Sequence, residues 1–281
     1  MKNRVKIISS IVILAVVIVA GFIGKNKPTE NKYVSVHFID VSQGDCQLIE
    51  LPEGKTMLID AGDNGSEDVI IDYLHKLKVK KIDYLVATHP HADHIGGMAE
   101  IISEFDIGEI YMPKVQNNTR TFEDMLDVID KKNLTISTAY EGKVIFDYSG
   151  VRAEILSPKK DKTYDEMNNY SAVIMLKCQD RKFLFMGDAE KDIEAEILKM
   201  DLEADVLKVG HHGSSTSSSL KFLKGVSPEY AVISCGEGND YGHPHKKAIN
   251  NLQKVTKNIL RTDKSGTIII RTDGSRIDIE E

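Results

Sequence analysis

The stretch "ATHPHADHIGG" (residues 87–97) holds three histidines and one aspartate within six positions, namely His89, His91, Asp93 and His94. The whole chain of 281 residues has nine histidines, so this crowding needs a cause. The overlapping run "KIDYLVAT" (residues 81–88) is largely apolar, as is typical of a buried strand. The motif should therefore start at the carboxyl end of a strand, where α/β folds place ligands. Imidazole and carboxylate groups together suit zinc, iron or manganese, and we interpret the motif as metal-binding.

The spacing within the motif predicts two ions rather than one. Residues i and i+2 of an extended loop point the same way, so His89 and His91 can reach one ion. Asp93 and His94 stand at the start of the next predicted helix and can turn toward a second ion. A neighbouring pair of ions is therefore expected beside this loop.

Other predicted strands also end in side chains suited to such a site. Asp60 follows the apolar run "MLI", Asp188 follows "FLFMG", and His211 and His212 follow "DVLKVG". A single aspartate at a strand end is more often a turn or helix-capping residue. Several such residues in one chain with the histidine motif indicate a shared metal centre, in which Asp188 is placed to bridge two ions.

The hydrophobic pattern predicts an α/β fold. Apolar strands such as residues 33–39, 46–51 and 55–60 are followed by helical periodicity at residues 66–77, and similar alternation continues to the end of the chain. Each half of the chain begins with strands and continues with helices. This order predicts two sheets packed face to face with helices on the outside.

Charge and cysteine usage exclude some classes of protein. The formal net charge is −7, which does not indicate a protein that grips nucleic acid through basic residues alone. A substrate phosphate held by metal ions is not excluded by this charge. Cys46, Cys178 and Cys235 form no C-x-x-C pair, and we interpret them as small buried hydrophobic residues rather than a disulfide framework or a thiolate metal site.

The N-terminus predicts a membrane association. Residues 1–24, "MKNRVKIISSIVILAVVIVAGFIG", combine a basic start with a long apolar stretch, as in a signal anchor or transmembrane segment. The basic flank predicts a cell-membrane protein with a single span and its catalytic domain outside. The alternative is secretion after signal cleavage. Residues 25–32 are a predicted linker, and residues 33–281 the folded domain.

Several motifs together resemble a known family. They are "IDVSQGDC" (39–46), "ATHPHADHIGGM" (87–98), "NNYSAVI" (168–174), "VLKVGHHGSSTSS" (206–218) and "YGHPH" (241–245). In order and spacing they resemble the metallo-β-lactamase fold superfamily and, more closely, the metallo-hydrolase domain of the ComEC competence proteins. The resemblance covers nearly everything after residue 33. It implies an αββα four-layer sandwich that holds a metal-activated water between its two sheets.

The resemblance also implies roles for the candidate residues. His89 and His91 would bind the first ion, Asp93, His94 and His211 the second, and Asp188 would bridge them. The cofactors would be two divalent metal ions, zinc or manganese. Asp188, His212 and Asp60 are the expected catalytic residues: Asp60 would orient histidine ligands, and His212 would either donate a proton to the leaving group or hold the loop.

The sequence departs from the family pattern in two ways. It has no histidine between His94 and His211, where many superfamily members supply a third imidazole, so Asn168, Asn169 or Ser171 stands in that region. The ComEC relatives also lack this histidine and tend to have aspartate at the position of His91. ComEC proteins are multi-span channels, whereas this chain has one apolar N-terminal segment, so a role in DNA uptake is not implied.

Nearby polar residues have open interpretations. Ser214, Ser215 and Thr216 either contact substrate phosphate or cap the next helix, and His243 either faces the cleft or holds its loop. Asp45 and Gln43 are interpreted as structural residues near the site, and His37 and His75 as residues without a role in it.

Three functions therefore compete. The first is an extracytoplasmic dinuclear hydrolase of phosphodiesters, a nuclease or phosphodiesterase with nucleic acid as its substrate. The second keeps the site but acts on a cell-surface or small phosphoester, such as a phosphocholine decoration or a teichoic-acid-like polymer. The third is a non-catalytic polymer-binding module with a degenerate metal site. The membrane is the expected partner through the N-terminal segment, and no protein partner is predicted.

Overall fold

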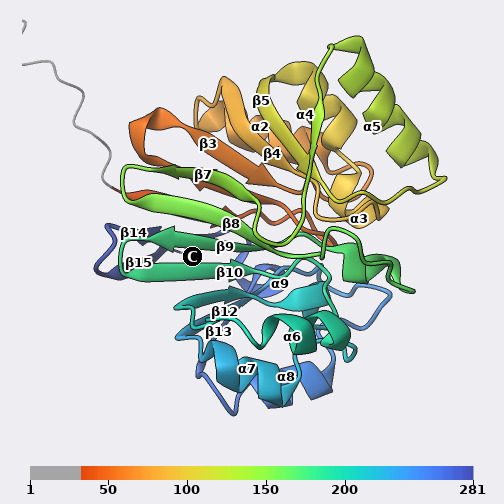
Figure 1. Ribbon diagram of the computed structural model, residues 1–281. Coiled ribbons are helices and arrows are strands. Elements are labelled where there is room, and N and C mark those ends of the chain that lie inside the picture. Colours follow the sequence, from red (N-terminus) through yellow and green to blue (C-terminus); the bar gives the residue numbers. More distant parts are fainter. Residues whose placement is uncertain (1–32, 281) are drawn as a thin grey trace, which may run out of the picture. The chain divides into compact units, whose positions relative to one another are not determined.

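The computed structural model describes residues 33–280, which form two β sheets packed face to face (Figure 1). The eight-stranded sheet has the order β15-β14-β1-β2-β3-β4-β5-β6. Its strands are β1 (Val34–Phe38), β2 (Gln47–Glu50), β3 (Thr56–Ile59), β4 (Lys81–Val86), β5 (Asp106–Met112), β6 (Ile136–Thr138), β14 (Ile268–Thr272) and β15 (Ile277–Glu280). The seven-stranded sheet has the order β13-β12-β11-β10-β9-β8-β7. Its strands are β7 (Val144–Tyr148), β8 (Val151–Ser157), β9 (Val173–Cys178), β10 (Arg181–Phe185), β11 (Val206–Lys208), β12 (Tyr230–Ile233) and β13 (Asn258–Arg261).

Helices cover the outer face of each sheet. The α-helices are α2 (Glu67–Lys76), α3 (Ala92–Ile95), α4 (Met98–Glu104), α5 (Arg120–Lys131), α6 (Lys191–Ile197), α7 (Leu220–Val226), α8 (Lys246–Leu252) and α9 (Thr262–Ser265). Short 3₁₀ turns are η1 (Pro52–Gly54), η2 (Met167–Tyr170) and η3 (Gly210–Gly213). Figure 1 shows α2, α4 and α5 against the eight-stranded sheet and α6, α7 and α8 against the other. The predicted αββα arrangement is therefore confirmed.

Three apolar clusters hold these layers together. The largest lies between the sheets, where the Phe38 and Phe185 rings stack with centroids 6.2 Å apart. A second cluster packs the helices on the eight-stranded sheet, and a third packs those on the seven-stranded sheet. Burying one such aromatic or aliphatic side chain contributes about 1.5–3 kcal/mol, so the sandwich is stabilised by a dry interior on both faces of each sheet. Cys46, Cys178 and Cys235 are buried in these clusters with free thiols, as predicted.

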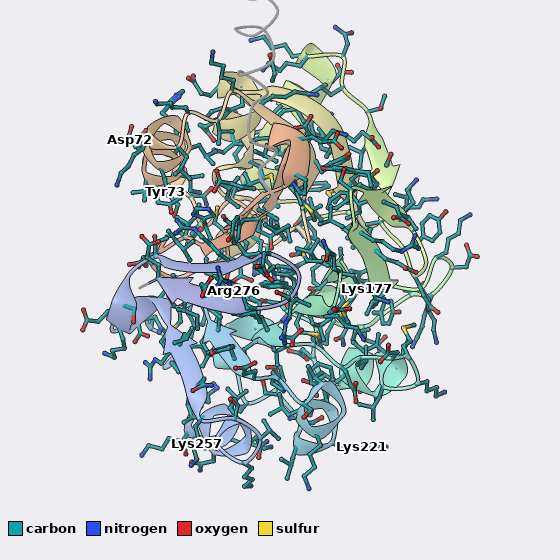
Figure 2. All side chains as sticks on the ribbon, turned by 90° about the vertical axis from the view of Figure 1, so that its left-hand side faces the viewer. Asp72, Tyr73, Lys177, Lys221, Lys257 and Arg276 are labelled. Carbon is teal, nitrogen blue, oxygen red and sulfur yellow. The ribbon has the colours of Figure 1, made fainter. Side chains whose placement is uncertain are left out.

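The amphipathic pattern of the helices explains their orientation. Helix α5 begins after Thr119, whose side chain accepts a hydrogen bond from the backbone N–H of Phe122. Phe122, Met125 and Ile129 recur at helical spacing and are buried against the sheet. On the other side of the molecule, Figure 2 shows Lys221 and Lys257 pointing away from the ribbon. These two lysines therefore lie on the outside of the sandwich.

Parallel strands bring the candidate residues to one edge. Strands β3, β4 and β5 pair in parallel, as do β10, β11 and β12, so the loops after them leave the sheets in the same direction. Helices α3 and α4 are separated by Gly96 and Gly97. A Cβ atom on Gly96 would lie 2.1 Å from the carbonyl carbon of Asp63. Only glycine therefore allows this turn to pass beside the loop after β3.

The last hairpin crosses to the first sheet. Strand β14 pairs antiparallel with β1, with Val34 opposite Thr272, and β15 extends the same edge. The end of the chain therefore completes the sheet formed by its beginning. Strand β13 and helix α9 have no counterpart among the elements expected from the sequence, because both are short and lack a clear apolar period.

The predicted anchor (residues 1–24) and linker (residues 25–32) lie outside the described residues, so both stay predictions. Within residues 33–280, the helices are all too short or too polar to cross a bilayer.

Candidate metal centre

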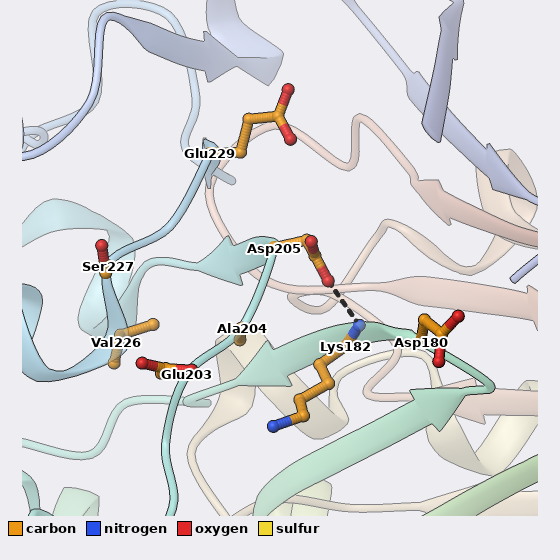
Figure 3. A pocket seen from close by; sticks show the side chains of 8 residues that line it. All are labelled: Asp180, Lys182, Glu203, Ala204, Asp205, Val226, Ser227 and Glu229. Atoms are coloured by element: carbon orange, nitrogen blue, oxygen red, sulfur yellow. Dashed lines mark hydrogen bonds between the residues drawn. The ribbon is translucent and has the colours of Figure 1, made fainter. Parts of the chain in front are cut away.

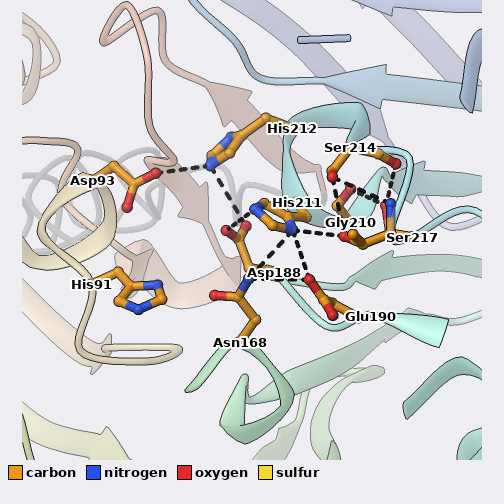
Figure 4. Close-up of polar contacts among 12 residues, drawn as sticks. His91, Asp93, Asn168, Asp188, Glu190, Gly210, His211, His212, Ser214 and Ser217 are labelled. Carbon is orange, nitrogen blue, oxygen red and sulfur yellow. Dashed lines mark hydrogen bonds and ion pairs between the residues drawn. The ribbon is translucent and has the colours of Figure 1, made fainter. Parts of the chain in front are cut away.

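The loops after β4, β10 and β11 meet around a cavity of about 340 Å³. Figure 4 shows the side chains that converge there from these loops. Asp188 and His212 are buried residues of its lining, and His91, Asp93 and His211 are partly exposed there. His89 and His94 are buried outside the lining, with Nε2 of His94 3.1 Å from Asp188. The structure therefore brings the sequence-predicted metal residues together, although they come from both sheets.

His94 is held between two carboxylates. Its Nδ1 lies 2.7 Å from Oδ2 of Asp60, and its Nε2 lies 3.1 Å from Oδ1 of Asp188. Asp60 is itself fixed, because its two oxygens accept hydrogen bonds from the backbone N–H and the hydroxyl of Thr88. This is the contact that an orienting carboxylate behind a metal-binding histidine makes, and it leaves Nε2 of His94 facing Asp188.

His212 is oriented in a similar way. Its Nδ1 lies 3.0 Å from the backbone carbonyl of Ser234, which makes this nitrogen the hydrogen-bond donor. Its Nε2 points into the cavity, 3.2 Å from Oδ2 of Asp93 and 3.6 Å from Oδ1 of Asp188 (Figure 4). A neutral His212 in this tautomer therefore presents a lone pair to the space shared with Asp93 and Asp188.

The nitrogen and oxygen atoms that meet beside the cavity are arranged as ligands of a metal ion rather than as hydrogen-bond partners of one another. Nε2 of His94, Oδ1 of Asp188 and Nε2 of His212 are buried, and within the described part of the chain none has a hydrogen-bond partner. Together with Asp93 these residues offer ligand atoms that all lie within 4.8 Å of one another. Ligands of a tetrahedral ion bound at about 2.0–2.1 Å lie roughly 3.4 Å apart, close to the separations found here. The group accordingly fits one divalent ion.

The residues predicted for the first ion form a smaller set. Nε2 of His89 lies 3.0 Å from Nδ1 of His91. The other nitrogen of His89 lies 3.4 Å from the hydroxyl of Ser171, which also accepts a hydrogen bond from the backbone N–H of Asp188. Two imidazoles therefore lie together at this position, and Ser171 contacts both His89 and the backbone of Asp188.

The structure separates the roles of the two adjacent histidines. The sequence assigned His211 to the second ion, whereas His212 lies in the four-residue cluster. His211 lies at its rim, where Nε2 is 3.6 Å from Oδ2 of Asp188 and Nδ1 is 3.3 Å from Oε1 of Glu190. Both histidines have φ near +51°, so the turn η3 sends neighbouring side chains in directions that sequence spacing does not reveal. The geometry favours exchanging the two assignments.

The electrostatics of the cluster are dominated by burial and by the paired charges. Burial lowers the pKa of His89 well below its usual value. Burial alone would also lower the pKa of His212, but the Asp188 and Asp45 carboxylates outweigh it and raise this pKa to about 10. Burial would raise the pKa of Asp188, but His94 and His212 hold it well below its usual range. The carboxylates are therefore ionised at neutral pH and provide the charge that a cation needs.

The serine-rich loop after η3 is held by its own contacts. The hydroxyls of Ser214 and Thr216 lie 3.0 Å apart, and the backbone N–H of Ser215 donates to Nδ1 of His245. His243 lines the cavity, and its buried Nδ1 has no hydrogen-bond partner among residues 33–280. Of the two interpretations of His243, the geometry favours the one that faces the cleft.

Further predicted residues lie around the cluster. Asn168 lines the cavity, and its Nδ2 lies 3.3 Å from Nδ1 of His211. Asn169 accepts a hydrogen bond from the backbone N–H of Glu190, and Gln43 accepts one from that of Gly236. His37 and His75 lie on strand β1 and helix α2 and pair with glutamates outside the cluster.

Sequence reasoning missed two residues near the site. Lys208 is buried behind the cluster, and Tyr241 is exposed at the rim of the cavity. The lysine within the apolar run "DVLKVG" was a signal for the first, because a charged residue in a buried strand needs a partner. Nothing in the local pattern distinguishes Tyr241 from any loop tyrosine.

A second hollow lies at the other end of the seven-stranded sheet (Figure 3). Its residues, such as Lys182, Asp205 and Glu229, stand at the amino ends of β10, β11 and β12, whereas the histidines lie beyond the carboxyl ends. Asp205 accepts a hydrogen bond from the backbone N–H of Lys182 and pairs with Arg181. These carboxylates serve local structure.

The fold and the cluster together define the class of protein. The sequence profile of the metallo-β-lactamase superfamily matches residues 39–237, so the chain belongs to that superfamily. Its members are generally metal-dependent hydrolases, and the Asp/His cluster agrees with that class.

Two curated relatives are similar in sequence to most of this chain. The chain is 31% identical over 255 residues to ComE operon protein 3 of Bacillus subtilis (strain 168), covering 84% of this chain and 33% of that protein. It is 29% identical over 259 residues to the competence protein ComA of Neisseria gonorrhoeae, covering 90% of this chain and 35% of that protein. The chain thus spans about a third of the length of these curated relatives. The resemblance to ComEC-type competence proteins is confirmed.

Comparison with a solved structure supports the assignment of the fold and carries no argument about function. The metallo-β-lactamase fold protein YhfI from Bacillus subtilis superposes with a TM-score of 0.54 at 11% identity, covering 81% of this chain and 95% of that one.

Proposed function

We propose that this chain is a dinuclear metal-dependent phosphodiesterase that acts on nucleic-acid strands. The observation that carries the proposal is the convergence of three buried atoms, Nε2 of His94, Oδ1 of Asp188 and Nε2 of His212, which lie 3.1–3.6 Å apart in ion-pair contacts and make no hydrogen bond within residues 33–280. A buried polar atom without a partner is costly, and a divalent ion would satisfy all three at once.

The residues around this point suit phosphoryl chemistry. Asp93, His94, Asp188 and His212 would hold one ion, and His89 and His91 with Asp188 the other. Divalent ions in such sites act as Lewis acids on phosphoryl oxygens and lower the pKa of the attacking water. His211 stands at the open rim beside Glu190 and is placed to contact the leaving group. Asp60 and the Ser234 carbonyl fix the histidine rings before substrate arrives.

Two observations support a nucleic-acid strand as the substrate. The curated relatives include proteins named for competence and for recombination. The ring of Tyr241 is 65% exposed at the rim of the cavity and stacks on His243 with centroids 5.6 Å apart. An exposed aromatic face of this kind can stack with a base of a single strand.

A second candidate substrate is a small or cell-surface phosphoester that carries a cationic group. A pocket of about 690 Å³ shares Gln43 and Asp63 with the metal cavity and is lined by Asp40, Glu237 and Asp263. Lys264 also lines this pocket and pairs with Glu237 and Asp263, but the carboxylates outnumber it. The excess negative charge would repel a polyanionic strand and attract a quaternary ammonium such as that of phosphocholine.

The experiment compares the two substrate classes on one preparation. The full chain, loaded with zinc or manganese, would be assayed on single-stranded DNA and on p-nitrophenyl phosphocholine. We expect cleavage of DNA, lost in Asp188→Ala and kept in the surface control Asp72→Ala. Tyr241→Ala should raise the KM for DNA with little change in kcat.

Cleavage of the choline ester alone would favour the second candidate substrate. Two bound ions without turnover of either substrate would contradict both and favour a binding module.

The place of action is also a proposal. We infer that residues 1–24 anchor the protein and that the hydrolase domain faces the outside of the cell. External protease added to intact cells should digest the domain while the cytoplasmic proteins survive. Protection of the domain in intact cells, with digestion after lysis, would contradict this location.

A further inference from the structure

A fully buried ion pair lies directly behind the metal cluster. Nζ of Lys208, on strand β11 of the seven-stranded sheet, contacts Oδ2 of Asp45, in the loop after β1 of the eight-stranded sheet. Both side chains are at most 1% exposed. The pair therefore joins the two sheets at the base of the site.

Asp45 contacts the loops that carry the second ion's candidate ligands. Its backbone N–H donates to the carbonyl of Asp93 at 3.1 Å, and its carbonyl accepts from the N–H of Gly62 at 2.8 Å. Its Oδ1 lies 3.5 Å from Nδ1 of His212. The segment at Gly44 and Asp45 passes so close to Asp93 that a Cβ atom on Gly44 would lie 2.6 Å from the carbonyl oxygen of Asp93.

Lys208 contacts the backbone next to Asp188, another candidate ligand. Its Nζ lies 3.4 Å from the carbonyl oxygen of Gly187, the residue before Asp188. The same lysine leads the chain from β11 into η3, which carries His212. One ion pair thus contacts the backbone beside Asp93 and Asp188 and the ring of His212, three candidate ligands that come from different loops.

Stability alone does not account for this pair. Removing two charges from water costs free energy that their attraction often only offsets, and apolar residues of similar volume would serve a sandwich core at least as well. The pair, in contrast, contacts the backbone of Asp93, the backbone of Gly187 and the ring of His212, which belong to the segments that hold the ligands.

We propose that Asp45 and Lys208 form a positioning pair that sets the geometry of the second ion's ligands. Neither residue lines the cavity of the metal site, and Asp45 is paired with Lys208. The proposal rests on the metal centre of the proposed function but not on the identity of the substrate. It predicts that loss of the pair weakens the site formed by Asp93, Asp188 and His212 and leaves the site at His89 and His91 nearly unchanged.

The test measures metal binding rather than turnover. The full chain, stripped of metal, would be titrated calorimetrically with zinc alone and with manganese alone. Wild type should bind two ions. The double variant Asp45→Asn/Lys208→Met removes both charges and should remain folded, whereas each single variant leaves one charge buried without a partner. In the double variant we expect one ion to bind as in wild type and the other about tenfold or more weakly.

Lys182→Met is the matched control, because Lys182 on the adjacent strand β10 pairs with the exposed Asp201 away from the cavity. It should bind both ions as wild type does. Thermal unfolding of each metal-free variant separates positioning from a general loss of structure. A double variant that binds two ions with wild-type affinity would overturn the proposal. A double variant that fails to fold would assign the pair to stability instead, and would also overturn it. If wild type itself binds no metal, the proposed function fails first.

Discussion

Oδ2 of Asp60 accepts a hydrogen bond from Nδ1 of His94 at 2.7 Å, while the other nitrogen of the same ring faces Asp188. This contact fixes both the tautomer and the orientation of His94 before any ion is bound. It joins the loop after β3, which carries Asp60, to helix α3 after β4, which carries His94.

The first prediction follows from that contact. Asp60→Ala should weaken metal binding by about 10- to 100-fold, because His94 loses its orienting partner while remaining able to bind. Competition with a chelator of known affinity would measure this. Asp72→Ala, on the exposed face of α2, is the control for the removal of a carboxylate. Equal metal affinity in Asp60→Ala and wild type would show that the contact does not orient the ligand.

The second prediction separates the adjacent histidines. His212→Ala should lose one of two bound ions, because His212 belongs to the buried cluster. His211→Ala should keep both ions and lower kcat, since His211 stands at the rim beside Glu190. Metal content per chain and steady-state kinetics of the same preparations would decide. The reverse pattern would restore the assignment made from the sequence.

The third prediction concerns metal removal. Zinc added at about 100 times its Kd should stabilise the stripped protein by about 2.7 kcal/mol per site, a rise in Tm of roughly 5–10 °C for a protein of this size. Asp188→Ala should lose most of this increase, because Asp188 faces both predicted ions. Thermal unfolding with and without metal measures the shift. An unchanged Tm in wild type would argue against a preformed metal centre.

The fourth prediction is a pH dependence. Carboxylates raise the pKa of His212 to about 10, above the usual value near 6.5 in an unfolded chain. The stability that charged His212 contributes to metal-free protein is therefore complete below about pH 6.5 and is lost as the pH rises toward 10.

The affinity for a metal ion changes with pH in the opposite direction. It increases as the pH rises, because His212 must be neutral to bind the ion. The metal-induced rise in Tm should therefore be larger at about pH 8.5 than at about pH 6, both below the raised pKa. In His212→Asn this difference should shrink. A rise that is the same at both pH values in wild type would contradict the assignment of His212 as a ligand that must lose a proton.

The fifth prediction tests the contact between the sheets. Phe38→Ala should lower the free energy of unfolding by about 3–5 kcal/mol, because it opens a cavity against Phe185 in the interior. Val69→Ala, on an exposed position of α2, should change it by less than about 0.5 kcal/mol. Denaturant unfolding of both variants provides the comparison. Similar small effects in both would mean that the sheets are not held by this cluster.

Most of the secondary structure could be predicted because its signals are local. The apolar run before His89, the helical period of residues 66–77 and the turn residues between strands depend on neighbours in the chain. The histidine motif could also be predicted to form part of a metal site, since its four side chains lie within six positions. The ordering of Asp60, Asp188 and the pair His211 and His212 at strand ends extended that prediction to a shared site.

By itself, then, the sequence determined the α/β class and most of the strands, and it supplied most of the candidate ligands. Only the tertiary structure decided which of His211 and His212 faces the cluster, because two successive residues with positive φ redirect neighbouring side chains. The tertiary structure also decided that the last hairpin joins β1 and that Asp45 meets Lys208, 163 positions away. Contacts between such distant residues follow from the packing of two sheets, and no local pattern encodes them.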